Sequence, residues 1–192
     1  VVGITPITRI ALNLRQNILR YLDAGALGVL IPMVNTKAEA QAVVDAVKYP
    51  PVGKRGLAGV RANMFGLTGS LTDYVAQSNQ ETLVITQVET LEAVKNLPEM
   101  LQVPGIDCIF VGPTDLSTAM GYPGQINHPE VEAMMSKLAK QITSAGKPAG
   151  TIAYDFDVLK RRKEQGFTFI SAGVNPLLVK ASRDYLAAAK GR

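Results

Sequence analysis

Short runs of β-branched and apolar residues alternate along the chain with longer stretches of helical period, and no other feature of the sequence restricts the fold as strongly. Such alternation is typical of repeated βαβ units, whose strands lie parallel in one sheet. Six runs predict strands, at Ile4–Ile10, Gly28–Pro32, Thr82–Glu89, Asp107–Val111, Pro148–Ile152 and Phe167–Ser171. The sequence therefore predicts an α/β protein with a parallel sheet of six strands.

Six βα units are compatible with two architectures. An open doubly wound sheet is complete with five or six strands, whereas a closed (β/α)8 barrel needs eight. The helices predicted between the strands, such as the one that begins with the capping-box pair Thr36 and Glu39, occur in both. The pattern of elements alone leaves the architecture open, and a length of 192 residues favours one domain over residues 1–192.

Composition and charge argue against several classes of protein. The 20 lysines and arginines against 16 acidic residues give a net charge of +4, and the basic residues are scattered, so we expect no nucleic-acid partner. No apolar run is long enough to cross a bilayer, so we expect no membrane association. The single cysteine, Cys108, lies in an apolar strand, which indicates an inert thiol in a reducing compartment. We therefore expect a cytoplasmic protein.

Two acidic residues follow successive predicted strands. Period-two alternation along the third strand places Gln87 and Glu89 on the same face, with Glu89 at the C-terminal end. Asp115 lies just after the next strand. Successive parallel strands are usually neighbours, so both carboxylates are expected at the C-terminal edge of the sheet, where α/β active sites form. From the residues alone, the two side chains could equally well cap the helices that follow them.

Two carboxylates in one small volume repel each other unless a proton or a cation lies between them. A pair of carboxylates with open positions for water and substrate suits Mg²⁺ or Mn²⁺, which prefer oxygen ligands. The turn Gly112-Pro113-Thr114 offers backbone N–H groups for the carboxylate of a substrate. This pattern predicts a divalent-metal site beside a binding place for an organic acid.

Several of these motifs are similar to those of the HpcH/HpaI aldolase family of class II, metal-dependent pyruvate aldolases. The likeness extends over nearly the whole chain, and the Gln-x-Glu and Gly-Pro-x-Asp-Leu motifs are its most specific parts. The matching stretches are Gly25–Asn35, Pro50–Arg61, Gln87–Glu89, Asn96–Pro98, Val111–Leu116 and Met120–Tyr122. The resemblance implies a TIM (β/α)8 barrel. It also implies a carbon–carbon lyase of aromatic or sugar-acid catabolism, which cleaves a 4-hydroxy-2-oxo acid to pyruvate and an aldehyde through a metal-bound pyruvate enolate.

The resemblance also implies roles for individual residues. Glu89 and Asp115 match the family's ligands to a divalent metal, Mg²⁺ or Mn²⁺, with Co²⁺ as a further option. Arg9 matches the arginine that contacts the keto oxygen of bound pyruvate, and Gln87 matches the glutamine beside the metal. Asp23 matches an aspartate near a neighbouring subunit's active site, in line with the homo-oligomer, a hexamer or trimer, that the family implies.

The match to the family has gaps. Its first two βα units would precede Val1, together with a histidine and an acidic partner thought to transfer protons, so we expect the chain to be part of a longer barrel. The only histidine, His128, precedes Pro129 at a predicted helix start, where it is expected to cap the helix. Two alternatives stay open: a lyase acting on acyl-CoA esters, as in the citrate-lyase β-subunit branch, and a non-catalytic scaffold.

Overall fold

The computed structural model describes residues 3–67 and 69–191. A sheet of six strands lies at its centre, and the strands pair in chain order from β1 to β6. These strands are β1 (Ile7–Arg9), β2 (Gly28–Ile31), β3 (Leu83–Val88), β4 (Cys108–Val111), β5 (Ala149–Ile152) and β6 (Phe169–Ser171). The six predicted strands are confirmed, each somewhat shorter than its apolar run.

The order of the strands decides between the two architectures. Each strand pairs with the one before it and the one after it in the chain, and every pairing is parallel. A doubly wound sheet reverses its direction of growth at a switch point, and this order contains no reversal. It is the order of a (β/α) barrel, in which a parallel sheet curls with its helices on the outside. The sheet is therefore a curled, barrel-type sheet with β1 and β6 at its edges.

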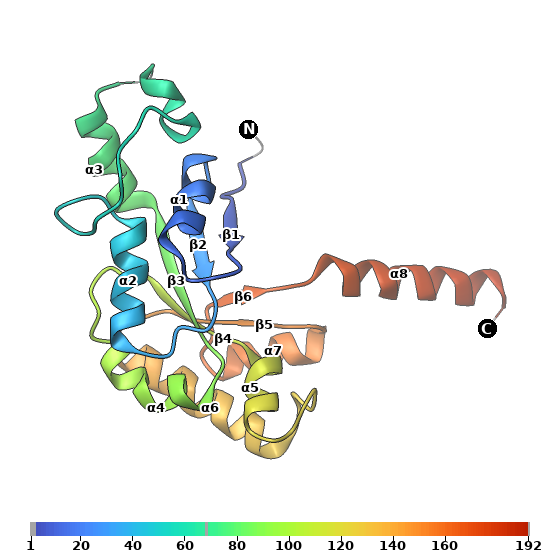
Figure 1. Cartoon of the computed structure of the whole chain (residues 1–192). Coiled ribbons are helices and arrows are strands. Elements are labelled where there is room, and N and C mark those ends of the chain that lie inside the picture. The colour runs from blue at the N-terminus through green and yellow to red at the C-terminus, as the bar shows by residue number, and fades with distance from the viewer. Residues whose placement is uncertain (1–2, 68, 192) are drawn as a thin grey trace.

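Helices connect the strands and cover one side of the sheet (Figure 1). The capping box predicted for the second helix is present. The hydroxyl of Thr36 accepts a hydrogen bond from the N–H of Glu39, and the carboxylate of Glu39 accepts one from the N–H of Thr36, both at 3.1 Å. The helices are α1 (Arg15–Asp23), α2 (Lys37–Val47), the 3-10 helix η1 (Arg61–Gly66), α3 (Leu71–Glu81), α4 (Leu91–Met100), α5 (Pro113–Ala119), α6 (Pro129–Ser144), α7 (Phe156–Glu164) and α8 (Val174–Ala189).

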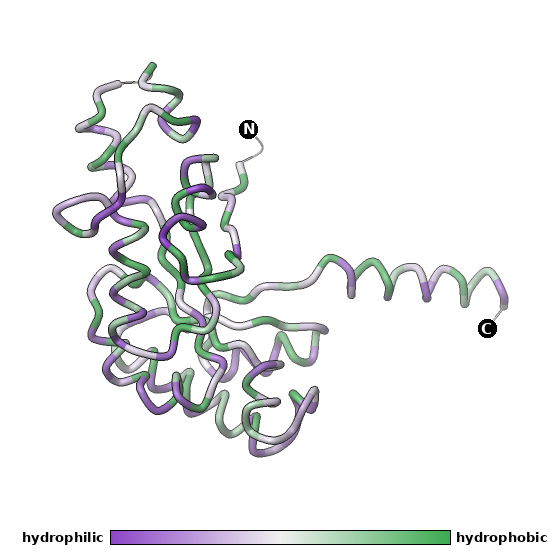
Figure 2. Tube along the Cα trace, viewed as in Figure 1, coloured by the Kyte–Doolittle hydropathy of each residue, from purple (hydrophilic) through white to green (hydrophobic). Residues whose placement is uncertain are grey.

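Helix α8 differs from the other helices in its surroundings. It leaves the sheet after β6 and extends away from the remaining elements (Figure 1), and none of its residues is buried. Apolar and polar residues alternate along it (Figure 2). No helix among the described residues combines the length and the apolar character that a membrane span requires.

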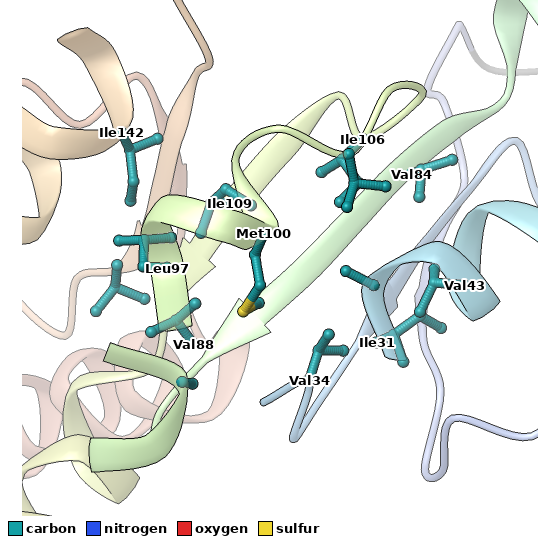
Figure 3. Close-up of a cluster of buried hydrophobic side chains, with 14 of the residues drawn as sticks. Ile31, Val34, Val43, Val84, Val88, Leu97, Met100, Ile106, Ile109 and Ile142 are labelled. Carbon is teal, nitrogen blue, oxygen red and sulfur yellow. The ribbon is translucent and has the colours of Figure 1, made fainter. Parts of the chain in front are cut away.

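The main hydrophobic core lies between the sheet and the helices. Alternate strand residues face this layer, among them Ile31, Val84, Val88 and Ile109, and they pack against helix residues such as Leu97 (Figure 3). Because strand side chains alternate between the two faces, this pattern leaves the intervening residues for the opposite face of the sheet.

The opposite, inner face of the sheet carries a second, smaller apolar cluster of Leu30, Ile85, Cys108 and Phe110. Burial raises the pKa of the Cys108 thiol to about 12, which agrees with the expected inert thiol. This inner face forms one wall of the candidate site.

Candidate functional site

A cavity of about 380 Å³ opens at the C-terminal ends of the strands. Its apolar wall is the inner face of the curled sheet, including Leu30 of β2, Phe110 of β4 and Phe169 of β6. Its polar lining includes Arg9, which ends β1, and Gln87 of β3. Residues 112–115, which follow β4, complete that side of the cavity. Segments that are far apart in the sequence are therefore brought to one edge of the sheet, as parallel strand order requires.

Glu89 follows β3 directly and is only 2% exposed. Its Oε1 accepts a hydrogen bond from the N–H of Met33 at 2.9 Å, and its Oε2 accepts one from Nε2 of Gln87. Met33 has a φ of 54°, in the left-handed region that non-glycine residues seldom adopt. This unfavourable backbone conformation points the N–H at the carboxylate, so Glu89 is fixed from two sides.

Asp115 is the third residue of α5 and lies beside Glu89. Burial raises the pKa of Glu89, the hydrogen bond from Met33 opposes that rise, and the hydrogen-bonding contact and charge of Asp115 reinforce it. The positive charge of Arg9 acts in the opposite direction. The structure thus brings together the two carboxyl groups expected at this edge, with the guanidinium of Arg9 close enough to influence Glu89.

The donor set at this point fits a hard divalent cation. Oε1 of Gln87 is buried and has no hydrogen-bond partner, directly beside a buried carboxylate. Among residues 3–67 and 69–191, no three histidine, cysteine, aspartate or glutamate side chains gather closely enough to hold an ion. The two carboxylates and the amide would leave several coordination positions of an ion to oxygen atoms of water and substrate. Mg²⁺ and Mn²⁺ favour this set of oxygen ligands.

Gly112 lies close to two polar side chains of this site. A Cβ atom at this position would lie 2.5 Å from Nε2 of Gln87 and 3.0 Å from Oε2 of Glu89. The backbone of Gly112 has an ordinary φ of −87°, so a side chain here would meet crowding and not backbone strain. The amide of Gln87 is consequently packed against the turn that carries Asp115.

We expect Gly112→Ala to lower the affinity for Mg²⁺ or Mn²⁺ about 10- to 100-fold, because the added methyl group displaces the Gln87 amide that positions Glu89. Isothermal titration with each metal measures the effect. Gly56→Ala is the matched control, because a Cβ at Gly56 has no atom within 4 Å. Equal metal affinities for the two variants would contradict the role given to this close packing.

The turn at residues 112–114 provides fewer N–H groups than the sequence predicts. The N–H of Gly112 donates to the carbonyl of Val88 at 3.1 Å, and Pro113 has no N–H. Thr114 lies in the first turn of α5, where a helix N–H has no intrahelical partner. The N–H of Gly112 is therefore not available to a substrate, and the residue instead allows the side chains of Gln87 and Glu89 to lie close to the turn. The N–H of Thr114 is the donor of this turn that remains available to a substrate carboxylate.

Two other predicted residues lie away from the cavity. Asp23 ends α1, and its Oδ1 accepts a hydrogen bond from Nη2 of the buried Arg55 at 2.8 Å, so its role at a neighbouring subunit stays a prediction. Nδ1 of His128 accepts a hydrogen bond from the N–H of Glu130 at 3.3 Å, and its ring stacks on Tyr122 with centroids 3.7 Å apart. The expected capping role of His128 is confirmed.

Sequence reasoning missed two contributors to the site, Met33 and Tyr154. Met33 acts through its backbone N–H, and nothing in the residue type signals a positive φ. Tyr154 follows β5 by two residues and lines the cavity. Its position just after the C-terminal end of a strand is a signal that could have found it.

Known proteins that this chain is similar to share one family. A family model described as HpcH/HpaI aldolase/citrate lyase matches residues 6–180. A 4-hydroxy-2-oxo-heptane-1,7-dioate aldolase of Shigella sonnei (strain Ss046) is 39% identical over 186 residues, which cover 97% of this chain and 71% of that protein. A crystal structure of a family protein from Burkholderia cenocepacia J2315 has a TM-score of 0.91 at 33% identity, over 97% of this chain and 74% of the other. An HpcH/HpaI aldolase from Desulfitobacterium hafniense DCB-2 has a TM-score of 0.87 at 28% identity, over 97% and 73%. The chain belongs to the HpcH/HpaI aldolase/citrate lyase family.

Proposed function

We propose that this protein is a divalent-metal-dependent aldolase that cleaves a 4-hydroxy-2-oxo acid to pyruvate and an aldehyde. The observation that carries the proposal is the pair of carboxylates, Glu89 and Asp115, beside a cavity that Arg9 and Gln87 also line. The relative from Shigella sonnei, which is named for aldolase activity on a 4-hydroxy-2-oxo acid, supports this reaction class.

Glu89 and Asp115 are the proposed ligands of the metal, which is Mg²⁺ or Mn²⁺, with Co²⁺ as a further option. When bound, such an ion acts as a Lewis acid toward the oxygens of a 2-oxo acid. Gln87 holds the carboxylate of Glu89 through its Nε2 and leaves its buried Oε1 for a water molecule or the substrate. The amide thus fixes the orientation of the deeper ligand.

Arg9 and Thr114 are the proposed contacts to the pyruvate half of the substrate. The C4 hydroxyl loses its proton to solvent and becomes the aldehyde carbonyl as the C3–C4 bond breaks. The electron pair of that bond stays on the pyruvate part, so negative charge develops on the keto oxygen. The guanidinium of Arg9 donates hydrogen bonds to that oxygen, and the N–H of Thr114 donates to the carboxylate. The apolar wall formed by Phe110 and Phe169 excludes water and so strengthens both interactions.

Pyruvate release tests the proposed reaction directly. The protein is incubated with Mg²⁺ or Mn²⁺ and a 4-hydroxy-2-oxo acid, and pyruvate is measured by a coupled assay with and without a chelator. We expect metal-dependent release. Absence of both cleavage and metal-dependent pyruvate binding would favour the scaffold alternative, and turnover of an acyl-CoA ester in place of the oxo acid would favour the citrate-lyase-like alternative.

The six strands are proposed to be part of a (β/α)8 barrel that here lacks its first two βα units. The strand order supports a barrel, because neighbours in the sheet are neighbours in the chain. The share of the Burkholderia cenocepacia structure that the chain covers, 74%, is close to six units of eight. In this arrangement residues 1–192 form one partial barrel domain.

A homo-oligomer is also proposed, with α8 as part of its interface. Val174, Leu178 and Tyr185 lie on one face of α8 by helical spacing, and they are 75%, 63% and 75% exposed. A helix that presents a row of large apolar side chains away from its own chain is stabilised by packing on another surface. The occupant we propose is a second copy of this chain.

Leu178→Glu is expected to reduce the mass of the protein in sedimentation-velocity ultracentrifugation to that of one chain, because a charged side chain cannot be buried in an apolar contact without a large free-energy cost. Arg183→Glu, which changes charge on the opposite face of α8, is the matched control and should keep the oligomer. A parent protein that already sediments as a single chain would overturn the proposed oligomer.

A further inference from the structure

The turn after β2 presents the backbone N–H of Met33 to Oε1 of Glu89. Met33 is 54% exposed, so the packing of its side chain does not account for its left-handed φ of 54°. A non-glycine residue keeps such a conformation only where the surrounding structure enforces it. The enforcing contacts therefore have to come from the neighbouring residues of the turn.

Asn35, two residues after Met33, is held by hydrogen bonds to two helices. Oγ1 of Thr90, the residue before α4, donates to Oδ1 of Asn35 at 2.5 Å. Nδ2 of Asn96 within α4 donates to the backbone carbonyl of Asn35 at 2.9 Å. The N–H of Asn35 donates to the carboxylate of Glu39 in α2 at 2.6 Å. This set of three contacts, the Asn35 clamp, fixes the residue through its side chain, its carbonyl and its N–H.

The clamp and the proposed metal ligand belong to one closed ring of bonds. Thr90 follows Glu89 directly in the chain. On the other segment, Asn35 follows Met33 by two residues. The bond from Thr90 to Asn35 joins the two segments on one side, and the bond from the Met33 N–H to the carboxylate joins them on the other. The direction of that N–H therefore depends on the bond across the ring. Outer partners of this kind orient the groups that hold a metal.

Helix capping and substrate contact do not explain the side chain of Asn35. Thr90 caps α4 by accepting a hydrogen bond from the N–H of Ala93 at 3.0 Å, and this bond does not involve Asn35. The N-cap of α2 is Thr36. The described residues that line the cavity include neither Asn35 nor Thr90. Both residues therefore act on a bound ligand only through other side chains or backbone groups.

We infer that Asn35 is a positioning residue of the metal site. Its side chain accepts the hydrogen bond from Thr90 and thereby holds Met33 in the left-handed conformation that directs the N–H at Glu89. This inference rests on the proposed metal-dependent function. Loss of the Asn35 side chain should weaken metal binding and loosen the Met33 N–H, although both proposed ligands, Glu89 and Asp115, remain.

Titration with Mn²⁺ in the presence of pyruvate, followed by calorimetry, compares three variants with the parent. Asn35→Ala should raise the Kd for Mn²⁺ by about tenfold or more, because the acceptor for Thr90 is lost. Asn35→Asp keeps an oxygen at that position and should bind within about threefold of the parent. Asn79→Ala is the matched control, because Asn79 is also half-buried and hydrogen-bonds the backbone of Tyr49 at 2.7 and 3.1 Å, but does not line the cavity. Its Kd should equal that of the parent, although its Tm should fall.

Amide hydrogen exchange gives a readout that needs no metal. In the metal-free protein, NMR measures the exchange of the Met33 N–H with deuterium. Asn35→Ala should speed this exchange by about tenfold or more, because an N–H whose acceptor is no longer held in place opens more often. Asn79→Ala should leave the exchange at the parent rate.

The outcomes separate the positioning role of Asn35 from the proposed function. Where the parent binds Mn²⁺ and pyruvate, an equal Kd for Asn35→Ala would overturn the inference alone, and so would an Asn35→Asp variant as weak as Asn35→Ala. A Met33 exchange rate that Asn35→Ala does not change would also overturn it, as would a Kd for Asn79→Ala raised as far as that of Asn35→Ala. A parent that binds no Mn²⁺ in the presence of pyruvate would overturn the proposed function, and the inference with it.

Discussion

Glu89→Gln is expected to weaken metal-dependent binding of pyruvate by more than about 100-fold, because it removes the charge of the buried ligand while it preserves the shape of the side chain. Isothermal titration of the protein with pyruvate in the presence of Mg²⁺ or Mn²⁺ measures the effect. The matched control is Glu92→Gln, which changes an exposed glutamate three residues away on α4 and should bind as the parent does. Parent-like binding by Glu89→Gln would remove Glu89 from the metal site.

The stability of the metal-free protein shows whether Glu89→Gln is folded. It also shows whether the buried charge of Glu89 destabilises the parent protein. Burial raises the pKa of Glu89, so the folded protein holds its proton more tightly than the unfolded chain does. The stabilisation from this proton is present at low pH and is lost as the pH rises through the folded-state pKa. As the pH rises above 4.5, the ordinary pKa of a glutamate, the Tm of the parent should therefore fall relative to that of Glu89→Gln, which stays neutral. Parallel Tm curves would contradict the cost assigned to this buried carboxylate.

Arg9→Met is expected to lower kcat for cleavage by about 10²- to 10³-fold, the effect seen when one donor to a developing oxyanion is removed. Arg9 is an exposed residue at the end of β1, so the loss should not come from unfolding. Steady-state kinetics separates the two parameters. Because the hydrogen bond strengthens as charge develops, kcat should fall more than KM rises.

Two further variants make the Arg9 result specific. Arg9→Lys keeps the charge but loses the planar fork of donors, so we expect it to recover only part of the lost kcat. Arg20→Met, which removes an exposed arginine from α1, should have parent-like kinetics. An Arg9→Met enzyme with a normal kcat and a raised KM would assign Arg9 to ground-state binding of the substrate alone.

The sequence alone predicted the parts of the fold that depend on local pattern. β-branched runs gave all six strands, and the pair Thr36 and Glu39 gave the start of α2, because both features depend on neighbours in the chain. The choice of a barrel over a doubly wound sheet was not accessible in this way. It depends on which strands pair, and residues distant in sequence decide that pairing.

The candidate site was predictable to a similar extent. Glu89 and Asp115 were found because strand ends of parallel sheets collect functional groups at one edge. The left-handed backbone of Met33, the use of the Gly112 N–H by Val88 and the contact of Thr114 with Tyr154 were not predictable. Each of these depends on the path of a loop in three dimensions, which the residue types do not specify.

The central claim is that Glu89 and Asp115 share one divalent ion that a 2-oxo acid also reaches. The most direct test is anomalous diffraction from crystals soaked with Mn²⁺ and pyruvate. We predict a single anomalous peak within ligand distance, about 2.0–2.6 Å, of oxygens from both carboxylates, with the pyruvate oxygens completing its coordination. A peak bound by only one of the two carboxylates, or one located away from the cavity, would contradict the claim.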